Sequence, residues 1–299
     1  MPDNRCTHCA GCHTGQRPCL ASATAGTRAW LLVEHPGPWG EEIDRMALPA
    51  PLAEAIARAR RHGVRPQFIR SPRRRRATPP LRVYAGFSGE PSGPEGAWLE
   101  GRELEDLEEL ADLDLEAVGA GRSPGFGLPV TRPVLLVCTH GRHNACCARV
   151  GAPLARFLHE RFGDVWETTH VGGDRYAANL VCLPHGLYYG DLDEERAMTA
   201  AEEYRHGRVV LEGYRGRAGL AEPVQAAEHF VRARSGVLGV EAVAVERVVG
   251  DLAIVRAGQA RYRVRVEQRP MDACGPGCGE DIRTYIERDL TLLNETALV

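Results

Sequence analysis

The sequence lacks any apolar stretch that approaches the ~20 residues a helix needs to cross a bilayer. Its first residues, MPDNRCTHCAGC, are polar and contain no apolar segment of the kind found in signal peptides. It also lacks a large charge excess: the formal net charge is −3, so nothing global points to nucleic acid or to a membrane surface. We therefore expect a cytoplasmic protein with neither a nucleic-acid nor a membrane partner.

Cysteine, by contrast, is abundant. The chain has 10 cysteines, and disulfides are rare in the cytoplasm. In a reducing compartment, clustered cysteines indicate metal binding or catalysis more often than crosslinks. They form an N-terminal group of Cys6, Cys9, Cys12 and Cys19, a central group of Cys138, Cys146, Cys147 and Cys182, and a C-terminal pair of Cys274 and Cys278.

A chain of 299 residues favours two domains. In the first half, apolar runs and a helical stripe follow the order strand, helix, strand and strand pair, which is a thioredoxin-like order. The glycine- and proline-rich segment Gly119–Pro129 is the expected boundary between the halves. The expected elements before it are strand Trp30–Glu34, helix Leu52–Arg61, and strands Pro66–Ile69, Leu81–Ala85 and Ala97–Glu100.

The second half has a clearer pattern. Val134–Val137 is a continuous apolar run, as in a strand buried on both faces. The pattern then predicts a helix over Cys147–His159, a strand over Val165–Thr169, and a hairpin of Leu180–Leu183 and Leu187–Tyr189. We also expect a helix over Pro223–Arg234, followed by a β-meander of three strands over Ala242–Val248, Leu252–Arg256 and Arg261–Glu267.

Three candidate ligands lie at the ends of these elements. Cys138 ends one predicted strand, Cys147 begins the next helix and His170 ends the neighbouring strand. Because the carboxyl ends of adjacent parallel strands meet at one edge of a sheet, these side chains can converge. Amide groups at a helix N-terminus also stabilise a thiolate. Thiolate and imidazole ligands together suit zinc or an iron–sulfur centre.

Several segments resemble the sucrase/ferredoxin-like family, whose members are relatives of the thioredoxin-like 2Fe–2S ferredoxins. The most specific is HVGGDRYAAN, which begins at His170; CTHGRHNACC (Cys138–Cys147), WLLVEHPGPWG (Trp30–Gly40) and YRGR (Tyr214–Arg217) also resemble the family. The resemblance spans Trp30–Gln268. It implies a non-catalytic electron carrier with a 2Fe–2S cluster and a partner protein for electron exchange. No pair of glycosidase carboxylates is evident, so we expect no sucrase activity.

The resemblance also implies four cluster ligands. Two are cysteines in a C-x8-C pattern, matched by Cys138 and Cys147, and two are histidines in an H-V-G-G-H pattern. His170 matches the first histidine, but Asp174 stands where the second is expected. Asp174 is the favoured fourth ligand, although a carboxylate is a harder ligand than imidazole or thiolate. The alternatives are Cys146, Cys182 or His185 as the fourth ligand, or a site with zinc or with no cluster.

Other residues of the same segments are expected beside the cluster. His140 and His143 lie in the loop that would shield or protonate the site, and Arg142 could neutralise its negative charge. Gly172 and Gly173 break the chain after His170. Asn179 is expected to bond backbone groups in this glycine turn.

The predicted fold class is α/β, with two thioredoxin-like halves and a small C-terminal α+β extension. Residues 1–28 are expected to form a cysteine-rich tail, and residues 29–118 a thioredoxin-like domain without a cluster. Residues 130–213 are expected to form the ferredoxin domain. Residues 214–299 are expected to contain the last helix, the meander and a cysteine-containing tail.

The N-terminal tail offers a candidate second metal site. Its spacing, Cys6-x2-Cys9-x2-Cys12-x6-Cys19, matches part of a bacterial ferredoxin motif, but the last interval differs. Four cysteines can also form a tetrahedral zinc site, and Cys274-x3-Cys278 could join the tail. A zinc site, a second iron–sulfur centre and a metal-free tail all stay open.

Two other functions stay open for the central cysteines. A thiol–disulfide oxidoreductase would use Cys146 or Cys147, although the absence of C-x-x-C at a helix start counts against it. A structural zinc protein would bind metal without redox activity.

Overall fold

The structure is a computed structural model that describes residues 20–73, 79–90, 96–271 and 282–293. The cysteines of the predicted second metal site lie outside the described residues; these are Cys6, Cys9, Cys12, Cys19, Cys274 and Cys278. None of the helices in the described ranges is both long and apolar enough to span a membrane.

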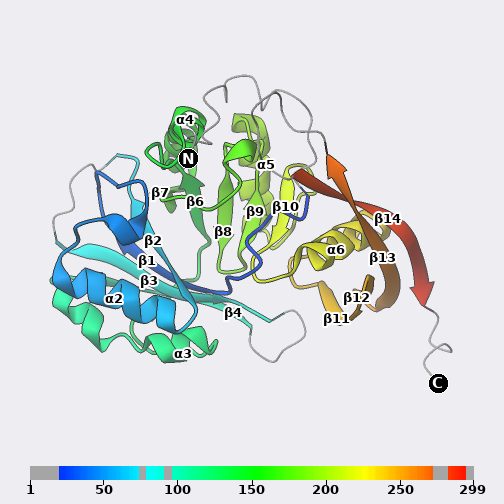
Figure 1. The fold of residues 1–299 in the computed structure, drawn as a ribbon, viewed down its shortest axis with the longest axis horizontal. Coiled ribbons are helices and arrows are strands. Elements are labelled where there is room, and N and C mark those ends of the chain that lie inside the picture. The colour runs from blue at the N-terminus through cyan, green and yellow to red at the C-terminus, as the bar shows by residue number, and fades with distance from the viewer. Residues whose placement is uncertain (1–19, 74–78, 91–95, 272–281, 294–299) are drawn as a thin grey trace.

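A large mixed sheet organises most of the chain (Figure 1). It has 10 strands in the order β10-β9-β8-β6-β7-β2-β1-β3-β4-β5. The strands are β1 (Ala29–Glu34), β2 (Val64–Arg70), β3 (Leu81–Ser88), β4 (Ala97–Leu104), β5 (Leu128–Pro129), β6 (Val134–Cys138), β7 (Val165–Thr168), β8 (Leu180–Leu183), β9 (Leu187–Tyr189) and β10 (Tyr214–Arg217).

The helices follow a similar plan in both halves. One helix connects the first two strands of each half, and another follows the fourth strand. The helices are α2 (Ala50–Arg61), α3 (Leu115–Gly119), α4 (Ala145–Phe162), α5 (Glu194–Arg205) and α6 (Glu222–Ser235), with short 3-10 turns η1 (Ile43–Arg45), η2 (Leu107–Asp112) and η3 (Asp174–Tyr176).

The two halves also share one pairing pattern. β1 pairs with β2 in parallel and with β3 antiparallel, and β6 pairs in the same way with β7 and β8. The second strands of the two halves, β2 and β7, pair antiparallel and so join the halves into one sheet. The predicted α/β class is confirmed; the assignment of each half as thioredoxin-like stays a prediction.

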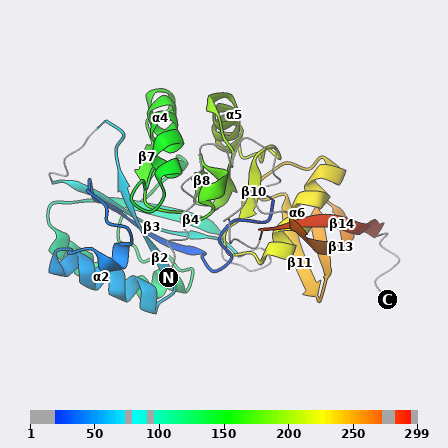
Figure 2. The same cartoon turned by 45° about the horizontal axis from the view of Figure 1, so that its top comes forward.

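The helices of both halves cover the outer face of the curled sheet. In Figures 1 and 2, α2 lies on one side of the molecule and α4 and α5 lie on the opposite side; Figure 1 also shows α3 beside α2. The sheet curls, and side chains from the two helix-free faces form a shared core that includes Trp30, Leu32, Leu136 and Tyr188. The first half is thus in position to reach the predicted ligands of the second.

The C-terminal part is a separate sheet of 4 antiparallel strands. Its strands are β11 (Val243–Val249), β12 (Leu252–Ala257), β13 (Ala260–Met271) and β14 (Ile282–Leu293). Alanines and Val231 on α6 pack against one face, with Val255 and Val264 beneath them. The predicted meander is therefore confirmed, and β14 extends it by a strand that the prediction did not contain.

Candidate metal centre

The structure brings together three of the predicted ligands. Cys138 ends β6, Cys147 lies in the first turn of α4, and His170 follows the end of β7. The two sulfur atoms and a ring nitrogen of His170 lie within 4.8 Å of one another. A group with two sulfur donors and one nitrogen donor is suited to a soft or borderline metal.

Local sequence explains this convergence. β6 and β7 are parallel and Cys138 pairs with Thr168, so Cys138 and His170, two residues after Thr168, lie at the same edge of the sheet. Helix α4 packs unusually close to β6 at Gly151, where a Cβ would lie only 2.1 Å from the carbonyl oxygen of Cys138. Glycine therefore allows the helix to bring Cys147 to the end of the strand.

The two thiols are buried and electrostatically unequal. A hydrogen bond from the Cys147 thiol holds the pKa of Cys138 well below its ordinary value, and His170 acts in the same direction. The same hydrogen bond, together with burial, raises the pKa of Cys147. Both side chains are 1% exposed. Cys138 is thus the cysteine of the pair that ionises more readily, and the thiolate is the form that binds metals.

His170 has a nitrogen available for a ligand. Its Nδ1 is buried and has no hydrogen-bond partner among the described residues. Buried polar atoms are nearly always bonded, so an imidazole that lies beside two thiols and has one unpartnered buried nitrogen fits a metal-binding role. The donor set and this orphaned atom together fit the metal centre that the sequence predicts.

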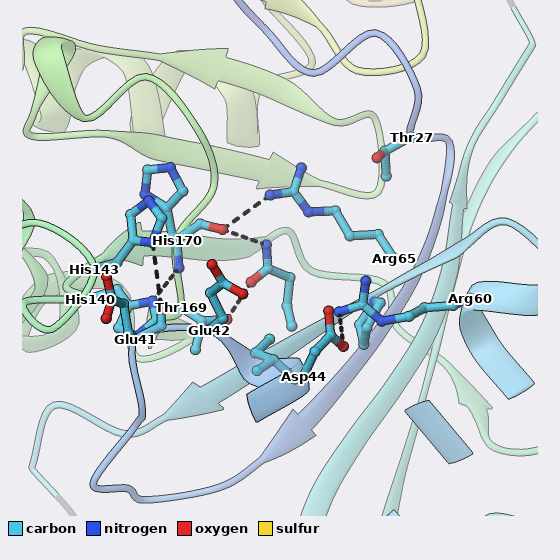
Figure 3. A pocket seen from close by; sticks show the side chains of 13 residues that line it. Thr27, Glu41, Glu42, Asp44, Arg60, Arg65, His140, His143, Thr169 and His170 are labelled. Carbon is cyan, nitrogen blue, oxygen red and sulfur yellow. Dashed lines mark hydrogen bonds and ion pairs between the residues drawn. The ribbon is translucent and has the colours of Figure 1, made fainter. Parts of the chain in front are cut away.

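The main chain of His170 is held from both halves of the molecule. Its N–H donates to Nδ1 of His140 at 3.1 Å, and its carbonyl oxygen accepts from Arg65 at 3.0 Å and from Gln67 at 3.2 Å. The ring of His143 stacks on that of His170 with 3.8 Å between centroids. Figure 3 shows these histidines together with Arg65, which comes from β2.

His140 is fixed in one neutral form. Its Nδ1 accepts from His170, so the ring proton lies on Nε2, which donates to the carbonyl of Gly40. Burial lowers the pKa of His140, which favours the same neutral form. Trp39 packs edge-on against the ring. The predicted loop histidine therefore acts as a support for the backbone of His170.

A cavity of about 370 Å³ adjoins the site (Figure 3). His143 and His170 form part of its wall, and Glu42, Asp44 and Arg65 line it from the first half. The thiols do not line it. Of the three converging residues, His170 is therefore the one that a solvent-borne molecule can approach.

Asp174 lies next to this group but is not one of its three members. It begins η3, and its Oδ2 accepts a hydrogen bond from Nδ2 of Asn144. Asn144 in turn is the N-cap of α4. The carboxylate is close enough to the site for its charge to act on Cys147, although less strongly than Cys138 and burial do.

The glycine turn between His170 and Asp174 is tightly supported. Gly172 and Gly173 have φ values of +93° and +70°, which favour glycine. Asn179 donates to the carbonyl of Gly173 at 2.8 Å, as predicted. The buried guanidinium of Arg215 donates to the carbonyl of Gly172 at 3.0 Å and to Asn179 at 2.7 Å.

The alternative fourth ligands lie elsewhere. The sulfur of Cys146 contacts Arg149 at 3.7 Å, and Cys182 is buried in the core under α4 and α5. His185 lies at the β8–β9 turn, where its ring contacts Tyr204 at 2.8 Å and Glu241 at 3.5 Å. None of them belongs to the three-donor group, and Arg142 is exposed in the loop.

Sequence reasoning missed several supporting residues. Arg65 and Gln67 are more than 100 positions from their partner His170, and no local pattern marks such a contact. Arg215 lies inside the YRGR segment, which signalled family resemblance but not a role. Asn144 precedes a predicted helix, so its N-cap role was accessible from the sequence.

The fold and the site define a mixed α/β protein with a candidate Cys–Cys–His metal centre. A family model described as sucrase/ferredoxin-like matches residues 20–216, which is more than half of the chain. The chain therefore belongs to the sucrase/ferredoxin-like family. Comparisons with curated proteins and with solved structures find no match. Helix α6 and the four-stranded sheet follow the matched residues.

Proposed function

We propose that this protein is an electron carrier that binds a 2Fe–2S cluster through Cys138, Cys147 and His170, with Asp174 as the fourth ligand. One observation carries the proposal: two buried sulfurs and an imidazole nitrogen lie within 4.8 Å of one another, where the family resemblance implies cluster ligands. The unpartnered, buried Nδ1 of His170 supports it.

A cluster bound here would supply one-electron transfer. The residues of this chain bind and orient it. Burial of Cys138 and Cys147 excludes water from the sulfur side, and His140, Arg65 and Gln67 hold the backbone of His170. A redox partner would approach from the cavity, because His170 and His143 line it.

The test is the metal content of protein purified without oxygen. We expect a red-brown sample with iron and acid-labile sulfide, and a paramagnetic resonance signal on reduction. Cys147→Ser should lose the iron, whereas Cys146→Ala, one position away, should keep it. Asp174→Ala should change the resonance signal. A colourless wild-type protein without iron would contradict the proposal.

A zinc site is the second candidate, and the compactness of the donor group favours it. With Zn–S bonds of ~2.3 Å, tetrahedral ligands lie roughly 3.7 Å apart, so three donors within 4.8 Å can surround one ion. Zinc without iron on elemental analysis, with a large loss of melting temperature on chelation, would select this function.

A further inference from the structure

A single side chain, Asn144, connects two elements that carry proposed ligands. Its Oδ1 accepts a hydrogen bond from the backbone N–H of Cys146 at 2.9 Å, and so caps the helix that presents Cys147. Its Nδ2 donates to Oδ2 of Asp174 at the start of η3. One amide group therefore fixes the start of α4 relative to the carboxylate.

This hydrogen bond orients Asp174. Nδ2 of Asn144 donates to Oδ2, and the second oxygen of the carboxylate is a further acceptor that could bind a metal. Carboxylates that bind metals are usually held by such a hydrogen bond, and loss of the supporting group commonly lowers metal affinity. The charge of Asp174 already acts on the neighbouring Cys147 thiol, behind the larger effects of Cys138 and burial.

We infer that Asn144 is a positioning residue that specifies a carboxylate at position 174 as the fourth ligand. The inference rests on the proposed function, because it takes Asp174 as a ligand. An amide N–H is a suitable partner for a carboxylate. A metal-bound histidine instead donates its second N–H, typically to a carboxylate or a carbonyl. The partner of residue 174 must therefore be a donor when that residue is aspartate.

The variant N144D separates capping from positioning. Aspartate is as good an N-cap as asparagine, so helix α4 keeps its start. It has no N–H to donate, and its charge repels Asp174. The variant D174N removes the charged ligand, and the double variant N144D/D174N restores a hydrogen bond of reversed polarity between the two positions.

The probe is cobalt(II) added to the metal-free full-length chain, followed by visible absorption, with C147S as the blank for cobalt held by other cysteines. We expect N144D to bind cobalt ~10- to 100-fold more weakly, with shifted bands. D174N should also bind weakly. The double variant should recover the melting temperature of the metal-free wild type but not its cobalt affinity. Wild-type affinity and bands in all three variants would overturn the inference.

A second comparison uses histidine at position 174. The variant D174H lacks an acceptor for the imidazole N–H, whereas N144D/D174H supplies one. We expect the double variant to bind cobalt more tightly than D174H alone. Equal or weaker binding by the double variant would contradict the positioning role of Asn144.

Reconstitution with iron and sulfide separates this inference from the proposed function. If the wild type forms no cluster but cobalt binding depends on residue 144 as described, the electron-transfer proposal fails and the inference stands. If the wild type and N144D form clusters with the same resonance spectrum and reduction potential, the function stands and the inference fails.

Discussion

At the scale of single residues, Gly173 shows how closely the loop between His170 and Asp174 fits against its neighbours. It lies between His170 and Asp174 with a φ of +70°, and a Cβ there would be 2.1 Å from Nη2 of Arg215. The same guanidinium bonds the carbonyl of Gly172. Neighbouring Gly172 also has a positive φ, but nothing lies within 4 Å of its Cβ position.

The two glycines therefore make a matched pair of variants. Gly172→Ala should cost about 1–2 kcal/mol, because it strains the backbone alone. Gly173→Ala should cost about 2–5 kcal/mol, because it adds a clash with the buried Arg215. Urea denaturation of both metal-free variants measures the difference. Equal stabilities would show that Arg215 moves aside freely.

At the scale of secondary-structure elements, the fit of α4 on β6 sets the distance between the two thiols. Gly151 is the contact point, opposite the carbonyl of Cys138. Glycine inside a helix normally costs roughly 0.5–1 kcal/mol relative to alanine. Its presence here is explained by the close approach and not by helix stability.

Gly151→Ala should destabilise the protein, although replacing glycine with alanine inside a helix normally stabilises it. We expect the free energy of unfolding to fall by about 1–3 kcal/mol, because the new methyl group pushes the helix away from the strand. We also expect weaker metal binding, because Cys147 moves away from Cys138. Thermal melting and metal affinity measure both effects. The control is Val150→Ala at an exposed neighbouring position, which should change the melting temperature and the metal affinity little. A Gly151→Ala variant more stable than the wild type would refute the close contact.

A second link between elements is His185, which joins the β8–β9 turn to Tyr204 on α5. Burial lowers the pKa of His185, and the charge of Arg217 acts in the same direction. Since the folded pKa lies below the unfolded value of ~6.5, the unfolded state takes up the proton first. The contribution of neutral His185 to the free energy of unfolding is therefore fully present above about pH 6.5 and is lost as the pH drops below that value.

Replacing His185 tests this pH dependence. His185→Gln should flatten the fall in unfolding free energy as the pH drops below about 6.5. The slope should not vanish, because burial also lowers the pKa of His229. Denaturant titrations across this range measure it. An unchanged slope would mean that His185 titrates alike in both states.

At the scale of the whole molecule, the two halves are joined where β2 meets β7. Arg70 contacts the Glu167 carboxylate at 2.6 Å across this junction, and Thr139 donates to the same oxygen at 3.1 Å. The guanidinium also stacks over Trp39, which packs against His140. The junction and the support of His170 therefore share one set of contacts.

Arg70→Met should destabilise the protein by about 3 kcal/mol, because it leaves the largely buried Glu167 carboxylate without its cation. The control is Arg73→Met, whose pair with Glu160 also links the halves but is more than half exposed on both sides. That variant should cost less than about 1 kcal/mol. Denaturant unfolding compares them, and similar costs would argue against a special role for the junction.

The sequence determined the local parts of this protein. Apolar runs and helical stripes predicted the strands and helices of both halves, because a strand or helix that is buried on one face or on both needs apolar residues at a characteristic spacing. Two strand ends and a helix start then located Cys138, His170 and Cys147. The tertiary structure added β14, which lies beyond the cysteine-containing segment Cys274–Cys278 and pairs with β13.

Only the tertiary structure decided what surrounds these three residues. The antiparallel pairing of β2 with β7 brings Arg65 and Gln67 of one half to the carbonyl of His170 in the other, and β10 brings Arg215 to Gly172. Such partners are set by which strands pair and pack together across a long sequence separation, and local periodicity carries no information about them. The identity of the donors was therefore readable in the chain, whereas their support, including the hydrogen bond from Asn144 to Asp174, required the folded molecule.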